Sequence, residues 1–95
     1  MKIAILMSTY NGHRYLDEQM KSLESQTLKY NMTVYVRDDG SGDDTIKIIE
    51  KWGKKLDIVL YKGKNVGPAK SFWELFMNPD IQADYYAFCD QDDVW

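Results

Sequence analysis

Aspartate residues concentrate in two short segments of this 95-residue sequence, RDDGSGDD and DQDD, which hold nearly half of its acidic residues. The second segment follows an apolar, strand-like run and contains Asp90 and Asp92. In an extended segment, residues two apart point the same way, so these two carboxylates can converge. Carboxylates at close range repel each other unless a cation lies between them, and their oxygens suit Mg²⁺ or Mn²⁺. The pattern therefore predicts a divalent-metal site at Asp90 and Asp92.

The first segment places Asp38 and Asp39 at the end of another strand-like run, before a glycine turn. Carboxylates in that position can accept hydrogen bonds from the N–H or hydroxyl groups of a ligand. A calcium-binding loop of the EF-hand type is an alternative, because oxygen-bearing side chains recur at alternate positions from Asp39 onward. Against it, Asp44 stands where such a loop needs glycine, and the preceding TVYV is strand-like rather than helical.

The hydrophobic pattern alternates between strand and helix along the whole chain. KIAILMS, MTVYVRD, LDIVLYK and ADYYAFCD have the length and composition of strands. Between them, Ser41 and Asp44 resemble a capping box, and Pro68 suits the first turn of a helix. The residues expected on the apolar faces of the three helices are Leu16, Met20 and Leu23, then Ile46, Ile49 and Trp52, then Phe72, Leu75 and Phe76. The order β-α-β-α-β-α-β predicts an α/β fold of three layers, α/β/α, with a mostly parallel sheet.

Such a sheet also predicts where function lies, because ligands bind outside the carboxyl ends of its strands. The segments STYNG, DDGSGDDT, GKNVGPAKS and DQDDVW follow the four strands and should meet at that edge. Ser8, Thr9 and Asn11 belong to the first of them and could instead cap the first helix. Lys64 and Lys70 are the cations expected nearest to this acidic edge, where a diphosphate would need one. We therefore expect a ligand site at the carboxyl edge.

Composition limits the classes of partner. The net charge of −3 and the isoelectric point near 5.0 argue against a nucleic-acid-binding protein. The single cysteine, Cys89, favours a reducing compartment, and the apolar runs are too short for a signal peptide or a membrane span. We expect a cytoplasmic protein. His13 is expected to be exposed in the first helical turn, and Phe72, Trp73, Tyr85 and Tyr86 to pack in the core and at its rim.

The four segments together resemble the amino-terminal, nucleotide-sugar-binding half of family 2 glycosyltransferases with the GT-A fold. STYNG, VRDDGSGDDT, NVGPAKSF and FCDQDDVW occur in the family's order and cover the whole chain. The likeness is strongest to bacterial members that include rhamnosyltransferases of surface-polysaccharide biosynthesis. One departure is GSGDD, where the family more often has GSTD. The resemblance implies that residues 1–95 are the donor-binding part of an incomplete GT-A domain, with the acceptor half and the general base downstream.

The resemblance also implies roles for individual residues. The nucleotide-binding residues would be Ser8, Thr9, Tyr10, Asn11, Asp38, Asp39 and Asp90. Either Asp38 or Asp39 would accept a hydrogen bond from the base, and Asp39 is the favoured one. Asp90 and Asp92 form the DxD motif of the family; the first acid tends toward the ribose and the later ones toward the metal, with Asp93 as a second contributor. The expected cofactor is Mg²⁺ or Mn²⁺.

In the implied reaction, a hydroxyl of a carbohydrate or lipid-linked acceptor attacks the anomeric carbon of a nucleotide-diphosphate sugar, with inversion. A divalent cation stabilises the leaving diphosphate. The full-length enzyme would associate peripherally with the inner face of the membrane, and this chain alone would transfer little sugar. The alternative is a nucleotide- or cation-binding module without turnover. A phospho-acceptor receiver domain and a nucleotidyltransferase are disfavoured, since the first needs acids where STYN stands and the second a basic glycine-rich loop.

Overall fold

The computed structural model describes residues 2–27 and 30–90 of the chain. Its elements are β1 (Ile3–Thr9), α1 (His13–Thr27), β2 (Met32–Asp38), α2 (Thr45–Trp52), β3 (Ile58–Lys62), α3 (Pro68–Phe76) and β4 (Tyr85–Asp90). The predicted alternation of strands and helices is confirmed element by element. The buried strand β1 reads as one apolar run because both of its faces are covered, as is usual in parallel sheets.

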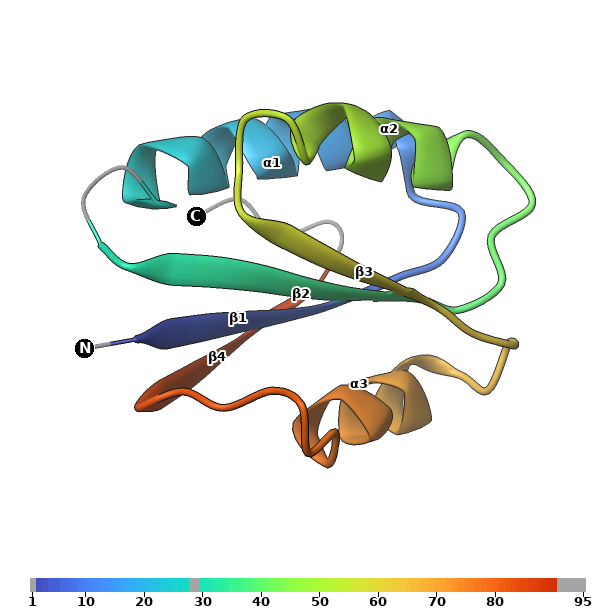
Figure 1. Cartoon of the computed structure of the whole chain (residues 1–95). Coiled ribbons are helices and arrows are strands. Elements are labelled where there is room, and N and C mark those ends of the chain that lie inside the picture. The colour runs from blue at the N-terminus through green and yellow to red at the C-terminus, as the bar shows by residue number, and fades with distance from the viewer. Residues whose placement is uncertain (1, 28–29, 91–95) are drawn as a thin grey trace.

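The four strands form one parallel sheet in the order β3-β2-β1-β4. Figure 1 shows α1 and α2 on one face of this sheet and α3 on the other. The predicted three-layer α/β arrangement is therefore confirmed. The chain adds β2 and β3 on one side of β1 and then β4 on the other side, so the switch in strand order lies between β1 and β4. Ligands of open parallel sheets bind at the carboxyl edge beside such a switch.

The larger core lies between the sheet and the helices α1 and α2. Leu16, Met20 and Leu23 are fully buried there, as their helical spacing predicts. They pack with Ile5 and Met7 of β1. Completely burying side chains of this size stabilises the fold by about 1.5–3 kcal/mol each. This core holds β1, and hence the loop that follows it, in a fixed position.

The apolar face of α3 differs from the expectation. Its buried residues are Ser71 and Leu75, whereas Phe76 is 47% exposed and Trp73 is 59% exposed. A helix of nine residues that lies against β1 and β2 buries only one narrow i, i+4 stripe. Phe76 instead contacts the rings of Tyr86 and Phe88 on β4.

The aromatic side chains near β4 also differ from the expectation. Trp73, Tyr85 and Tyr86 are exposed and Phe72 is partly buried, so none of the four lies in the core, whereas three of them pack against other rings at its rim. The physical reason is that β4 is an edge strand of the described sheet, so no strand covers its outer side. Phe72 instead packs edge-to-face on Phe88, Tyr86 packs edge-to-face on Phe76, and Trp73 lies tilted against Phe76.

The second helix begins later than the capping-box pattern suggests. Asp44 is its N-cap residue and makes no side-chain capping hydrogen bond, so Ser41 lies outside the helix. The hydroxyl group of Ser41 is engaged by Asp38 instead. The segment between β2 and α2 is thus a structured loop rather than the first turn of a helix.

Candidate functional site

Loops 10–12, 39–44 and 63–67 follow β1, β2 and β3 and open on the carboxyl edge of the sheet. Strand β4 ends at the same edge, and Asp90 is paired in register with Ser8 of β1. The backbone of Asp90 therefore lies at the switch in strand order. Asp92 and Asp93 lie outside the described residues, and only the backbone of Asp90 is described.

A network of hydrogen bonds fastens the first loop to the second. The hydroxyl group of Thr9 donates to Asp38 Oδ1 at 2.8 Å, and the backbone N–H of Ser41 donates to Asp38 Oδ2 at 2.8 Å. Asn11 adopts a positive φ of 48°, accepts a hydrogen bond from the Gly42 N–H and donates its own N–H to the Ser41 hydroxyl. Asparagine tolerates this left-handed conformation better than most residues. The two loops thus form one preorganised unit.

Asp43 extends this unit to the helices α1 and α2. Its carboxylate accepts from the backbone N–H and the hydroxyl group of Thr45 and lies 2.6 Å from His13 Nδ1. The Thr45 hydroxyl also accepts from the Gly12 N–H. Burial raises the pKa of Asp43, but hydrogen bonds from Thr45 and His13 outweigh it and hold the pKa well below its ordinary value. His13 is exposed, as expected, and its described partner is this carboxylate.

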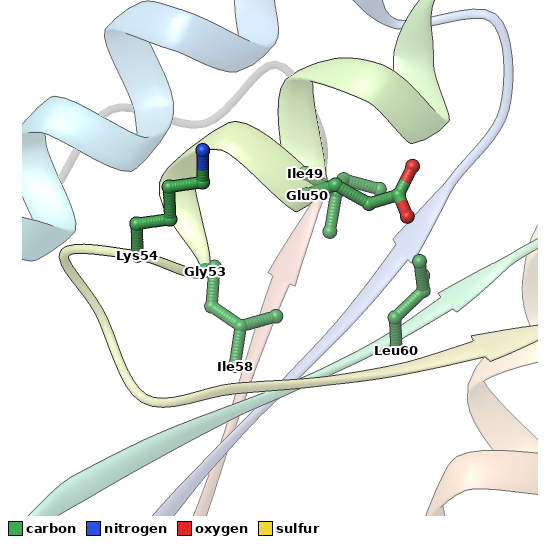
Figure 2. Close-up of a pocket in the computed structure, with 6 residues that line it drawn as sticks. All are labelled: Ile49, Glu50, Gly53, Lys54, Ile58 and Leu60. Atoms are coloured by element: carbon green, nitrogen blue, oxygen red, sulfur yellow. The ribbon is translucent and has the colours of Figure 1, made fainter.

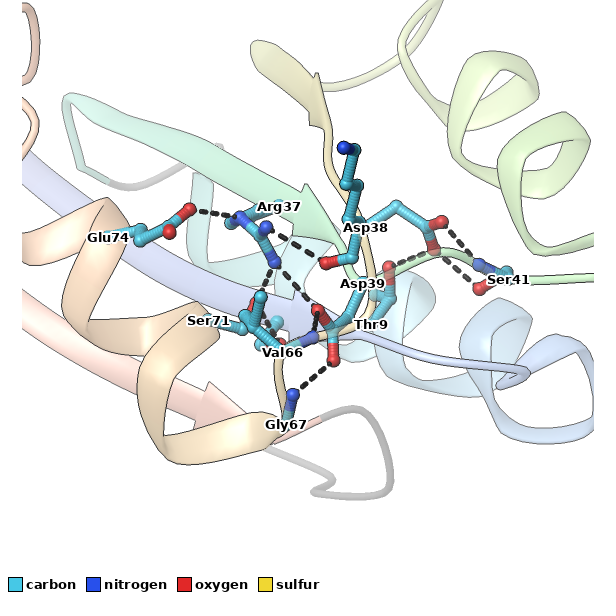
Figure 3. A network of polar contacts seen from close by, with 11 residues as sticks. Thr9, Arg37, Asp38, Asp39, Ser41, Val66, Gly67, Ser71 and Glu74 are labelled. Atoms are coloured by element: carbon cyan, nitrogen blue, oxygen red, sulfur yellow. Dashed lines mark hydrogen bonds and ion pairs between the residues drawn. The ribbon is translucent and has the colours of Figure 1, made fainter.

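A second network, drawn in Figure 3, joins Asp39 to the third loop and to Arg37. Asp39 Oδ1 accepts from Arg37 Nη1 and from the Val66 N–H, both at 2.8 Å, and Oδ2 accepts from the Gly67 N–H at 3.0 Å. Burial raises the pKa of Asp39, yet the hydrogen bonds from Val66, Arg37 and Gly67 lower it overall. Because Gly67 and Pro68 begin α3 without a side-chain cap of their own, Asp39 supplies the missing negative charge.

These contacts mean that two helix N-termini at the carboxyl edge already hold an aspartate. Asp43 lies at the start of α2 and Asp39 at the start of α3. A helix N-terminus is a common binding site for phosphate, but here a phosphate would displace or approach a carboxylate. Neither of these two N-termini therefore favours a phosphate.

The structure divides the sequence-predicted site residues into two groups. Ser8, Thr9, Asp38 and Asp39 are buried and hydrogen-bonded within the chain, and Ser8 donates to the Ser71 hydroxyl at 2.7 Å. Tyr10 and Asn11 are the two exposed members. All six lie at the carboxyl edge, so the structure brings them together.

Sequence reasoning missed Arg37, Ser71 and Glu74. Arg37 Nη1 donates to Ser71 Oγ at 3.0 Å, and Arg37 Nε lies 2.9 Å from Glu74 Oε2. One signal could have found this cluster. An arginine inside an otherwise apolar, buried strand is seldom buried without a charged partner. The expected cations Lys64 and Lys70 are exposed.

Acid should destabilise the chain, because Asp39 and Asp43 must take up protons. The pKa of each carboxyl is lower in the folded chain than its ordinary value of 3.8. Their stabilising contribution is therefore complete above about pH 5 and is lost as the pH falls through and below about 4. We expect the free energy of unfolding, measured with urea, to be about 1–2 kcal/mol lower at pH 3 than at pH 7. A flat profile between these pH values would contradict this account of the two carboxylates.

A cavity of ≈ 360 Å³ lies elsewhere, between α2 and β3 (Figure 2). It is lined by Ile49, Glu50, Gly53, Lys54, Ile58 and Leu60. Its lining residues belong to the last turns of α2, the two residues that follow it and the first part of β3, away from the three loops. Within residues 2–27 and 30–90, no three His, Cys, Asp or Glu side chains converge as a metal site. In the same part of the chain, no helix has the length and apolarity to cross a membrane.

Comparison with known proteins places this arrangement in a family. A family model described as Glycosyl transferase family 2 matches residues 4–95. The dTDP-rhamnosyl transferase RfbG of Shigella flexneri is 34% identical over 94 residues, which cover 94% of this chain and 32% of that protein. The poly(ribitol-phosphate) beta-N-acetylglucosaminyltransferase TarS of Staphylococcus aureus is 31% identical over 96 residues, 98% of this chain and 16% of that protein. The chain thus spans a third or less of these relatives.

Solved structures agree. S. aureus TarS 1–349 in complex with UDP-GlcNAc superposes with a TM-score of 0.84 at 32% identity, over 97% of this chain and 27% of that one. The mannosyltransferase PcManGT of Pyrobaculum calidifontis, in complex with GDP-Man and Mn²⁺, gives a TM-score of 0.84 at 19% identity, over 98% of this chain and 28% of that one, which shows the shared fold alone. The chain belongs to glycosyl transferase family 2 and has the fold of the amino-terminal region of its GT-A members.

Proposed function

We propose that residues 1–95 form the donor-binding part of a glycosyltransferase domain, which moves a sugar from a nucleotide-diphosphate donor to a hydroxyl group. The observation that carries this proposal is the convergence of three preorganised loops and the end of β4 at the switch in strand order. The TarS structure that superposes on the chain holds UDP-GlcNAc, which supports a nucleotide sugar as the ligand. The likeness to RfbG favours a rhamnosyl donor.

The loops supply different parts of the proposed nucleoside site. Tyr10 is exposed at the end of β1, where its ring can stack on a base. The Oδ2 atom of Asp39 accepts one hydrogen bond, from the Gly67 N–H. Its second lone pair can accept a hydrogen bond from a base N–H. Asp38 is held by Thr9 and Ser41, and in this proposal it supports the loop rather than the ligand. Asn11 faces solvent beside Tyr10 and can contact the ribose.

The residues of this edge fit a divalent cation. Asp90, Asp92 and Asp93 would hold Mg²⁺ or Mn²⁺, because they supply the hard oxygen ligands that these ions prefer. The ion would balance the charge that grows on the leaving diphosphate. The helix N-termini already carry Asp39 and Asp43, and the exposed Lys64 and Lys70 are the alternative cations that the sequence suggests.

In the reaction, the described residues bind and orient the donor. The stacked base and the hydrogen bond to Asp39 fix the nucleoside, and the network from Thr9 to Ser41 keeps both loops in place before the donor arrives. A ligand held in this way has already lost its orientational freedom on binding, so less entropy is lost when it reacts. We propose that the acceptor is a carbohydrate or a lipid-linked sugar, that it attacks with inversion, and that the general base lies outside this chain.

We further propose a cytoplasmic location at the inner face of the membrane, with peripheral association of the longer enzyme. The single, buried Cys89 fits a reducing compartment. A lipid-linked acceptor would bring the enzyme to a membrane surface. The acidic balance of the chain favours neither nucleic acid nor an anionic membrane as its direct partner.

Calorimetric titration of the chain with UDP, TDP and GDP, each with and without Mg²⁺ or Mn²⁺, tests the proposal. We expect saturable binding that depends on the metal and favours one base. Binding of the cation alone, with no response to any nucleotide, would favour the alternative of a cation-binding module. Binding of a nucleotide without metal dependence would contradict the proposed role of Asp90, Asp92 and Asp93.

Replacement of Tyr10 tests the stacking contact. Tyr10→Ala should weaken nucleotide binding by about 5- to 100-fold, since base–aromatic stacking contributes about 1–3 kcal/mol. The melting temperature should change little, because the side chain is 45% exposed. Tyr30→Ala is the matched control, an exposed tyrosine that precedes β2 at the opposite edge. Equal affinities for the two variants would contradict stacking on Tyr10.

A further inference from the structure

Arg37 occupies the centre of the second polar network. Its side chain is only 7% exposed, and each of its three guanidinium nitrogens already has a partner within the chain. Those partners lie in three parts of the chain. The guanidinium lies 2.8 Å from Asp39 Oδ1, donates to the carbonyl oxygen of Lys64 at 3.1 Å, and contacts Ser71 and Glu74 on α3. Figure 3 shows the guanidinium between α3 and the carboxylate of Asp39.

The third loop is shaped to accept this guanidinium. A Cβ atom added at Gly63 would lie 2.5 Å from Arg37 Cζ and closer still to Nη2, so a side chain there would overlap the guanidinium. The φ of Gly63 is not positive, so its backbone conformation is open to any residue. Glycine is required at this position because a side chain would lack space. The overlapped group is the far end of a flexible side chain, so an alanine would displace Arg37 and leave the backbone path intact.

The position of Asp39 depends on this arrangement. Its Oδ1 atom is shared by Arg37 and the Val66 N–H, so the same oxygen links the strand-borne cation to the loop before α3. A second nitrogen of the guanidinium, Nη2, donates to the carbonyl oxygen of Lys64 and so holds the same loop at another point. Planar, multidentate contacts of this kind restrict orientation more than a single ammonium group can.

We propose that Arg37 is a positioning residue for donor binding, which holds Asp39 and the loop 63–67 in the geometry that receives the nucleoside. This inference rests on the proposed function. It assigns Arg37 a role through Asp39, not a contact with the substrate. The nearby Ser71 and Glu74 anchor the other side of the guanidinium to α3.

Three variants test the inference in the 95-residue chain with UDP, TDP and GDP as probes in the presence of Mg²⁺. Arg37→Met removes the charge and keeps much of the volume, and Gly63→Ala displaces the guanidinium without removing it. We expect each to raise the Kd of the preferred nucleotide about tenfold or more, the size expected when a charged hydrogen bond is lost. Arg37→Lys should recover part of the affinity, because the ammonium group restores the charge but not the fork.

Two controls separate positioning from loss of stability. Gly53→Ala makes the same substitution at the end of α2, where the nearest atom to the added Cβ is 3.4 Å away, and should leave Kd unchanged within about twofold. Leu56→Val lowers stability from within the core at the far end of the sheet. It should lower the melting temperature without changing Kd.

The outcomes are distinct. Weaker binding in Arg37→Met and Gly63→Ala, with both controls near wild type and partial rescue by Arg37→Lys, supports positioning. If Arg37→Met does not fold, Gly63→Ala and Arg37→Lys still decide. Two results would overturn the positioning role. One is a Kd within twofold of wild type in both Gly63→Ala and Arg37→Lys. The other is a loss of affinity in Leu56→Val equal to that of the Arg37 and Gly63 variants with the same melting temperature. No binding by the wild-type chain would overturn the proposed function itself, and this inference with it.

Discussion

Asp39→Ala is expected to lower the free energy of unfolding by about 3–5 kcal/mol, the usual effect of removing one partner of a buried ion pair. The substitution leaves the buried guanidinium of Arg37 with only the half-exposed Glu74 as a carboxylate partner. It also removes the acceptor of two backbone N–H groups, Val66 and Gly67, at the start of α3. Small domains have a total stability of about 5–15 kcal/mol, so this loss should be visible directly in urea unfolding at pH 7.

Glu74→Gln is the matched control for this prediction. It removes the other carboxylate that contacts the same guanidinium, but Glu74 is 47% exposed. Solvent screens such a pair, so we expect a loss below about 1 kcal/mol. If the two substitutions cost the same, or if Asp39→Ala is close to neutral, the buried ion pair does not stabilise the carboxyl edge as described.

The second large effect is expected on ligand binding. Asp92→Asn should weaken metal-dependent binding of the preferred nucleoside diphosphate by about 100-fold or more, equivalent to ~3 kcal/mol. The amide keeps the size of the side chain and one ligand oxygen but loses the negative charge that holds a divalent cation. The same change at Asp90 should have a similar effect, since both acids belong to the proposed metal site. The measurement is calorimetry at fixed Mg²⁺ concentration, together with Mn²⁺ binding followed by electron paramagnetic resonance.

Asp57→Asn controls for the change in net charge. Asp57 precedes β3 at the opposite edge of the sheet, where it accepts a hydrogen bond from Thr33. Its replacement should leave nucleotide and metal affinity unchanged. If Asp92→Asn behaves like Asp57→Asn, the cation is held by other residues and the DxD assignment fails.

The order of the elements and the larger core could be predicted from sequence, because they depend on local periodicity. Leu16, Met20 and Leu23 recur at helical spacing and are fully buried. The continuous apolar run of β1 indicates a strand covered on both faces, and the sheet topology agrees. The convergence of the loops follows from the parallel order alone.

The face of α3 could not be predicted in the same way. Phe72, Leu75 and Phe76 form a plausible apolar stripe, yet the helix buries Ser71 and Leu75. Ser71 is held on the buried side of the helix by hydrogen bonds with Ser8 and Arg37. Those partners are 63 and 34 residues away in sequence, so no local pattern reveals them.

The state of the aspartates is a further limit of sequence reasoning. The sequence suggests that Asp38 and Asp39 are available to a ligand, whereas both are buried and accept several hydrogen bonds within the chain. For Asp39, these hydrogen bonds come from Arg37 and from Val66 and Gly67 of the loop after β3. Only a structure shows how much of each carboxylate is already engaged.

The most direct test of the proposed donor site is amide NMR of the chain during titration with the preferred nucleoside diphosphate, with and without Mg²⁺. The account predicts metal-dependent shifts that cluster at 8–11, 38–40 and 90–93, with smaller shifts at 63–67. A well-dispersed spectrum that does not respond to any nucleotide would contradict it. Shifts confined to the cavity between α2 and β3, around Ile49 and Leu60, would place the ligand elsewhere and contradict it equally.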